Sequence, residues 1–197
     1  MSNLVKSQSQ SPARATERVI LCADASGSME TRMTIHGGAD SLTRARATSE
    51  AMRAIIDVSS PSITQYGIVA FDSQAYVVMP PTTNYLSLLS KAYVGSQGTT
   101  SMHDGIETAL GLSPSRIILL SDGAPDYPNS VLAAATHAAE MGVKIDTISI
   151  GDSDEVLMQR IAEMTGGFWR MCQNPDDLVD AFCALESRAR LLLEHIG

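Results

Sequence analysis

The chain has 197 residues, of which 44% are hydrophobic and 18% are charged, and its formal net charge is -8. This length and composition predict one soluble globular domain, and the negative charge argues against non-specific binding to nucleic acid, which needs a basic surface. No apolar run approaches the roughly 20 residues of a membrane-spanning helix, and the first residues lack the apolar segment of a secretion signal. We therefore expect a cytoplasmic protein that does not enter a membrane and keeps its three cysteines reduced.

The first part of the chain predicts an arm, a strand and a helix. Residues 1–16 are rich in Ser, Gln and Pro, so we expect a flexible arm ahead of a single folded domain over 17–197. The apolar run at 18–24 predicts a strand that is buried on both faces. After a loop, Asp40 or Ser41 is positioned to cap a helix that runs for about four turns.

The remainder alternates between strand and helix patterns. Two short strands, 65–71 and 75–79, are joined by three polar residues as in a hairpin, and Pro80-Pro81 should close the second strand at a sheet edge. Further strands are expected at 115–121, 143–150 and 168–172, and helices at 85–94, 101–112, 129–141, 155–164 and 174–195. This alternation predicts an α/β fold with a mostly parallel sheet, helices on both faces and one antiparallel edge strand.

Three separated segments carry oxygen-bearing side chains that this topology would bring together. Asp24 ends the first strand and is followed at alternate positions by Ser26 and Ser28, Thr99 lies in a Gly-Thr loop before a helix, and Asp122 ends another apolar run. Ligands of open α/β sheets bind just outside the carboxyl ends of the strands. Carboxylate and hydroxyl oxygens suit a hard cation, Mg2+ first and Mn2+ or Ca2+ as alternatives. The plainer interpretation of the first segment is a strand end followed by a serine helix cap.

The order of these segments resembles the von Willebrand factor type A (VWA) domain family over roughly residues 17–186. The metal-ion-dependent adhesion site (MIDAS) of that family combines an Asp-x-Ser-x-Ser motif, a threonine in a Gly-Thr loop and an aspartate in an apolar-strand-Asp-Gly context. The resemblance implies an intact MIDAS with five metal ligands, Asp24, Ser26, Ser28, Thr99 and Asp122. It also implies a Rossmann-like, doubly wound, six-stranded sheet in the order 3-2-1-4-5-6, with the third strand antiparallel at the edge.

Two departures from the family pattern bear on the site. The loop over 30–39 is longer than the usual link to the first helix and lies beside the expected metal face, where it would adjust partner specificity. The family's Gly-Gly-Thr reads Gln97-Gly98-Thr99 in this chain, and the adjacent Thr100 is an alternative ligand.

A cation held in this way keeps an exchangeable position that an Asp or Glu of a protein partner can take. We therefore expect an intracellular protein-interaction module rather than an enzyme. The resemblance implies that its partner is an AAA+ ATPase of the MoxR kind. One alternative is a metal-dependent hydrolase with His36 or His103 as general base; another is a structural subunit whose site holds no metal. Asp126 and Asp152 follow strands that end at the same edge, so they predict an acidic rim.

Overall fold

The computed structural model describes residues 17–34, 41–92, 95, 97–151 and 153–194. The predicted arm over 1–16 lies outside these residues and stays a prediction. Within them, no helix combines the length and the apolar character that crossing a bilayer requires.

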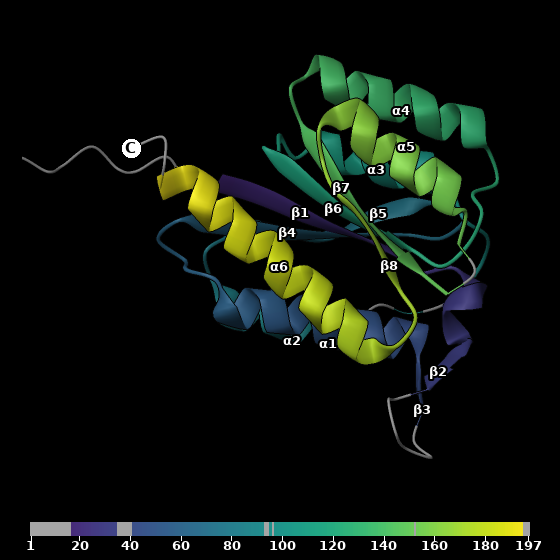
Figure 1. Ribbon diagram of the computed structural model, residues 1–197, viewed down its shortest axis with the longest axis horizontal. Helices are drawn as coiled ribbons and strands as arrows, with labels where there is room; N and C mark the ends of the chain where they lie inside the picture. Colours follow the sequence, from purple (N-terminus) through teal and green to yellow (C-terminus); the bar gives the residue numbers. More distant parts are fainter. Residues whose placement is uncertain (1–16, 35–40, 93–94, 96, 152, 195–197) are drawn as a thin grey trace, which may run out of the picture.

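A six-stranded sheet forms the centre of the fold (Figure 1). Its spatial order is β5-β4-β1-β6-β7-β8, and all neighbouring pairs are parallel except β4 with β5. The strands are β1 (Glu17–Asp24), β4 (Thr64–Phe71), β5 (Ala75–Thr82), β6 (Arg116–Ser121), β7 (Lys144–Ile150) and β8 (Trp169–Cys172). Numbered within the sheet alone, the order is 3-2-1-4-5-6 with an antiparallel edge strand, which confirms the predicted topology.

Helices cover both faces of the sheet, because the central strands are apolar at odd and even positions alike. In β1, Val19 and Leu21 belong to one buried cluster and Ile20 and Cys22 to the other. The first cluster is closed by α1 (Arg44–Val58), α2 (Tyr85–Lys91) and α6 (Pro175–Glu194), and the second by α3 (Met102–Leu110), α4 (Pro128–Glu140) and α5 (Glu155–Thr165). Figure 1 shows these two helical layers on opposite sides of the strands.

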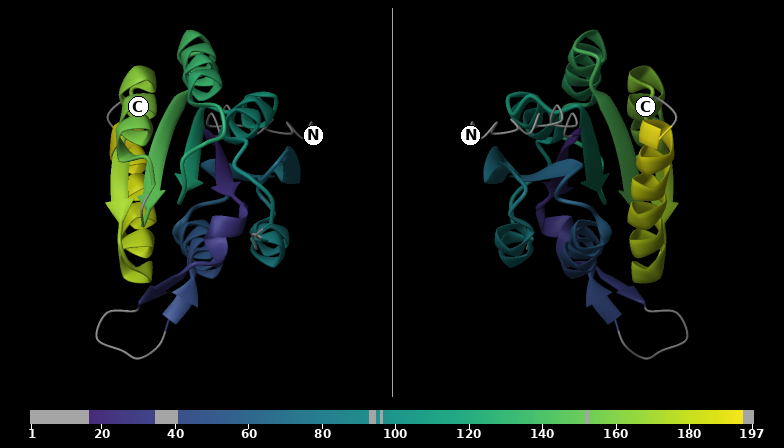
Figure 2. Two further views of the ribbon diagram at one scale, coloured as in Figure 1. Left: turned by 90° about the vertical axis from the view of Figure 1, so that its right-hand side faces the viewer. Right: turned by 90° about the vertical axis from the view of Figure 1, so that its left-hand side faces the viewer.

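The segment after β1 differs from the prediction. A 3-10 helix, η1 (Gly27–Glu30), leads into an antiparallel hairpin of β2 (Arg32–Thr34) and β3 (Ser41–Thr43), which projects from the body of the domain (Figure 2). The expected loop over 30–39 is therefore partly sheet, and its tip at 35–40 lies outside the described residues.

The start of the first helix was also predicted wrongly. Ser41 pairs with Thr34 in the hairpin and cannot cap, so α1 begins only at Arg44. Thr43 is the N-cap, and its hydroxyl oxygen accepts a hydrogen bond from the backbone N–H of Arg46 at 3.2 Å. Asp40, the other predicted cap, lies outside the described residues.

The edge strand is longer than predicted. β5 continues through Pro80 and Pro81 to Thr82, although the two prolines were expected to end it. Proline is tolerated on an edge strand because its missing N–H can face away from the neighbouring strand. The pairing of β4 with β5 is also irregular between Tyr66 and Val69, which relaxes the register at this point.

Candidate metal-binding site

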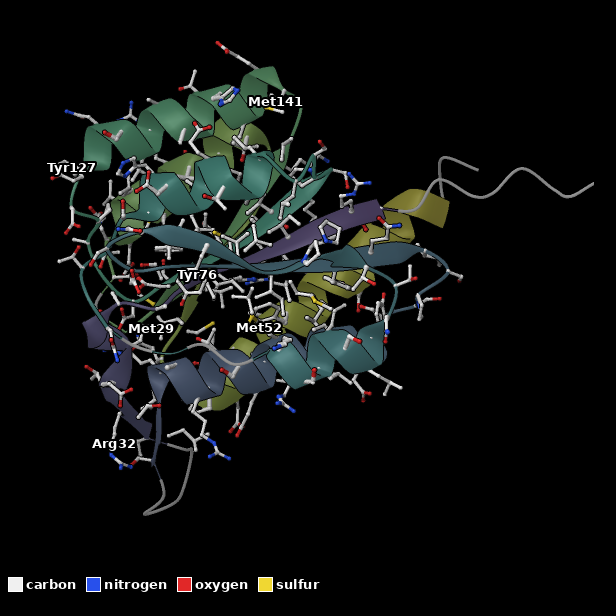
Figure 3. The ribbon with its side chains drawn as sticks, turned by 180° about the vertical axis from the view of Figure 1, so that it is seen from behind. Met29, Arg32, Met52, Tyr76, Tyr127 and Met141 are labelled. Carbon is white, nitrogen blue, oxygen red and sulfur yellow. The ribbon has the colours of Figure 1, made fainter. Side chains whose placement is uncertain are left out.

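The two predicted carboxylates lie at the same edge of the sheet. Asp24 is the last residue of β1 and Asp122 directly follows β6, the strand paired with β1. Strand order reverses at β1, which is the position where open α/β sheets bind their ligands. Figure 3 shows Met29 of η1, Arg32 of β2 and Tyr127 before α4 at this same end of the sheet.

Ser26 and Ser28 connect the two carboxylates through hydrogen bonds. The backbone N–H of Ser26 donates to Oδ1 of Asp24 at 2.8 Å, and the Oγ atoms of Ser26 and Ser28 are 3.0 Å apart. The hydroxyl of Ser28 donates to Oδ1 of Asp122 at 2.6 Å. Hydrogen bonds therefore join four of the predicted site residues in one chain: Asp24, Ser26, Ser28 and Asp122.

Ser121 belongs to this network although the sequence interpretation did not include it. Its hydroxyl donates to Oδ2 of Asp24 at 2.6 Å, so both oxygens of that carboxylate are hydrogen-bonded. The available signal was its position: Ser121 is a polar residue at the end of an otherwise apolar strand, immediately before the predicted ligand Asp122.

Asp24 is fully buried, and burial is the main cause that raises the pKa of its carboxyl from 3.8 to about 6. Hydrogen bonds from Ser121 and Ser26 act in the opposite direction, while the charge of Asp122 raises the pKa further. A buried carboxylate beside a second one is costly without a cation. The site is therefore electrostatically suited to a positive group.

The two adjacent threonines are not equivalent. Thr99 is exposed, whereas Thr100 is 8% exposed. The Oγ1 of Thr100 and the Oγ of Ser28 both border Gly123: a Cβ built there would lie 3.8 and 3.6 Å from them. A hydrogen bond of 3.1 Å from the N–H of Gly27 to the carbonyl of Gly98 ties the threonine loop to the Asp-x-Ser-x-Ser segment. Thr100 is therefore buried and borders Gly123 together with the hydroxyl of Ser28, whereas the side chain of Thr99 is exposed.

Arg44 is a second residue that sequence interpretation missed. Its Nη1 donates to Oδ2 of Asp122 at 2.8 Å, and the side chains are 11% and 0% exposed. The signal was its spacing on α1, because Arg44 lies on the same buried stripe as Ala47, Thr48 and Ala51. A charged residue on such a stripe needs a partner from elsewhere in the fold.

Of the remaining predicted residues, the structure describes His103 and Asp126. His103 contacts Ser101, Asp104 and Tyr127, with its ring 5.7 Å from that of Tyr127. Asp126 is exposed on the rim. His36 and Asp152 fall outside the described residues.

The donor set can be tested against the metal that it was predicted to hold. Across the described ranges, no three His, Cys, Asp or Glu side chains gather into a metal-binding cluster. The site offers instead two carboxylates and neutral hydroxyls, which match the oxygen preference of Mg2+, Mn2+ or Ca2+. The residues present therefore fit a hard divalent cation.

Comparison with known proteins agrees with this fold. A protein of the UPF0353 group from Mycolicibacterium paratuberculosis is 30% identical over 73% of this chain and 53% of its own length, so the chain spans about half of that relative. The structure of a von Willebrand factor type A protein from Catenulispora acidiphila superposes with a TM-score of 0.74 at 20% identity, covering 88% of this chain and 42% of the other.

A second similar structure is proximal thread matrix protein 1 from the mussel byssus, with a zinc-occupied MIDAS motif. Its TM-score is 0.69 at 19% identity, over 88% of this chain and 46% of the other. The family described as von Willebrand factor type A domain matches residues 19–124, more than half of the chain and the whole span from the Asp-x-Ser-x-Ser strand to Asp122. This chain belongs to the von Willebrand factor type A domain family.

Proposed function

We propose that the site is a working MIDAS that holds Mg2+ and binds an acidic side chain of a protein partner. The ligand-bearing residues are Asp24, Ser26, Ser28, Thr100 and Asp122, with Thr100 in place of the originally predicted Thr99. The observation that carries the proposal is the Ser28 hydroxyl, which lies 3.0 Å from that of Ser26 and 2.6 Å from Asp122. It joins two segments that are 94 residues apart in the chain.

A divalent cation bound there supplies an exposed positive charge and an exchangeable coordination position. That charge explains how a chain with net charge -8 would bind acidic partners. The zinc-occupied MIDAS of the mussel protein supports a divalent cation on this fold. Mg2+ rather than Mn2+ or Ca2+, an AAA+ ATPase as partner and a cytoplasmic location are parts of the proposal that follow from the family resemblance and the composition.

We propose an interaction module rather than an enzyme. A hydrolase would need a general base within hydrogen-bond reach of a water at the metal. His103 contacts Ser101, Asp104 and Tyr127, and none of these three residues is a proposed metal ligand. These contacts favour a role of this histidine in the surface that a partner would meet.

The first test is binding of Mg2+ by calorimetry to the wild-type chain, Asp122→Ala and the control Asp126→Ala. We expect binding to the wild type and to Asp126→Ala, because Asp126 is an exposed rim carboxylate, and none to Asp122→Ala. Equal affinity in all three proteins would show that the metal binds elsewhere.

The second test is capture of partners from the source cell in Mg2+ and in EDTA, with Asp122→Ala as the control bait. A partner retained in Mg2+ and lost in both controls supports metal-gated recognition. A partner retained in all three conditions would place the interface away from the metal face and contradict the proposal.

A further inference from the structure

Arg44 already places a positive charge at the proposed metal site. Its guanidinium contacts Oδ2 of Asp122 at 2.8 Å, while Ser28 contacts Oδ1 of the same carboxylate. Asp122 is thus shared between a permanent cation and the serine that joins it to Ser26. An arginine side chain does not lose its proton in a protein, so this charge is present at every working pH.

The fold holds both the guanidinium and the backbone of Arg44 in place. A Cβ built on Gly151, at the end of β7, would lie within 2.2 Å of Nη2 and 2.6 Å of Cζ of Arg44, so the guanidinium packs against bare backbone. The φ angle of Gly151 is +61°, a conformation that favours glycine. The backbone N–H of Arg44 donates to the carbonyl of Thr31 at 2.9 Å, which links the start of α1 to the base of the hairpin.

We propose that the positive charge of Arg44 lowers the affinity of the metal site for a divalent cation alone. As a result, the site preferentially binds a divalent cation together with a carboxylate. This inference rests on the proposed function. A divalent cation near Asp122 must share that carboxylate with Arg44 and is repelled by its charge. The negative charge of a partner's Asp or Glu relieves the repulsion, so metal and partner bind cooperatively, each raising the affinity for the other by the same factor.

The test is titration with Mn2+ alone, followed by electron paramagnetic resonance at low ionic strength, on the wild type and three variants. Arg44→Gln removes the charge, Arg44→Lys keeps it without the planar fork, and Arg46→Gln is the matched control. Arg46 is on the same helix but is 68% exposed and pairs with Glu50 on the surface. It therefore tests loss of one positive charge from α1 away from the site.

We expect Arg44→Gln to bind Mn2+ roughly tenfold more tightly than the wild type, because a unit charge repels a divalent ion by about this much even in a water-like dielectric. Arg44→Lys and Arg46→Gln should stay close to the wild-type affinity.

Weaker binding by Arg44→Gln, or no change, would overturn the inference and leave the proposed function standing, with Arg44 as a group that only holds Asp122 in place. If Arg44→Gln does not fold, Arg44→Lys still decides: an affinity well below that of the wild type shows that the fork, and not the charge, matters. No Mn2+ binding by any protein would overturn the proposed function and the inference together.

Discussion

Two buried Arg–Asp pairs lie at opposite ends of the sheet, and they have almost the same burial. At the carboxyl end, Arg44 and Asp122 have side chains 11% and 0% exposed; at the amino end, Arg116 and Asp146 are 10% and 3% exposed. Burial and pairing alone therefore do not separate them. The difference is in what surrounds each pair.

The pair at the amino end, Arg116 and Asp146, makes its further contacts with the backbone of neighbouring strands and helices. Asp146 also accepts the backbone N–H of Phe168 at 2.7 Å, just before β8, and Arg116 donates to the carbonyl of Leu185 in α6 at 3.3 Å. The carboxylate of Asp146 pairs with the guanidinium of Arg116, and their further contacts are to backbone groups. This pair connects β6, β7, the start of β8 and α6, so its role is structural.

The pair at the carboxyl end has additional oxygen atoms beside it. Ser28 connects Asp122 to Ser26, and the second carboxylate, Asp24, has a pKa raised to about 6 mainly by burial. Arg44 contacts Asp122, whereas Asp24 receives neutral donors only from Ser26 and Ser121 among its described contacts. The additional side-chain oxygens, rather than the buried ion pair, therefore distinguish the candidate metal-binding end of this sheet from the other end.

The largest expected effect comes from breaking the structural pair. Arg116→Ala leaves the carboxylate of Asp146 buried without its cation, which typically costs about 3–5 kcal/mol in free energy of unfolding. We expect the same loss in Mg2+ and in EDTA, measured by urea unfolding. A loss that Mg2+ reverses would contradict the assignment of this pair to the scaffold.

Asp24→Asn should separate metal binding from folding. We expect no measurable Mg2+ binding but, in EDTA at pH 7, a free energy of unfolding about 1–3 kcal/mol higher than that of the wild type, since each unit of pKa shift corresponds to about 1.4 kcal/mol. The asparagine keeps an acceptor for the N–H of Ser26 and can donate to the hydroxyl of Ser121. A less stable variant would show that the charge of Asp24 holds the apo fold together.

The same variant has a pH dependence of known sign. Folding raises the pKa of Asp24 from 3.8 to about 6, so the ionised carboxyl opposes folding. The cost is absent below pH 3.8, grows as the pH rises toward 6, and is complete above that value. The stability advantage of Asp24→Asn in EDTA should therefore shrink as the pH falls from 7 to about 4.5. Urea midpoints at a series of pH values measure this, and a constant advantage would exclude titration of Asp24 as its cause.

The choice between Thr99 and Thr100 as metal ligand can be tested by replacing each of them in turn. Thr100→Ala should weaken Mg2+ binding roughly tenfold, a common effect for losing one group of a metal site, while Thr99→Ala should change it little because that side chain is exposed. Calorimetric titration of both variants measures the difference. The reverse ranking would restore Thr99 as the ligand and show that the loop moves when the metal binds.

The mostly parallel sheet and the two carboxylates were predictable because each rests on a local pattern. Apolar runs on both parities indicate buried parallel strands, and aspartates directly after two of them, at Asp24 and Asp122, indicate the binding edge. The order 3-2-1-4-5-6 came from the family resemblance.

The remaining features depend on tertiary contacts that local patterns do not contain. The strands β2 and β3 have three residues each, too few to show the alternation of apolar and polar residues that is typical of a strand. The sequence therefore predicts a loop in place of this hairpin. The choice between Thr99 and Thr100 depends on the path of a loop in which Gly98 has φ +75°. Arg44 pairs with a residue 78 positions away, a contact that exists only once the start of α1 lies beside Asp122 and Gly151.

The smallest expected effect concerns the cap that fixes where α1, and with it Arg44, begins. Thr43→Ala removes the hydrogen bond to the N–H of Arg46 and should cost about 1 kcal/mol in free energy of unfolding. Ser41→Ala is the matched control: its hydroxyl accepts only an exposed contact from Arg32, so its loss should stay within about 0.5 kcal/mol. Urea unfolding of both variants in EDTA measures the difference. If Ser41→Ala were the more costly, the helix would begin where the sequence pattern placed it, and the guanidinium of Arg44 would no longer be held at the first turn, beside Asp122.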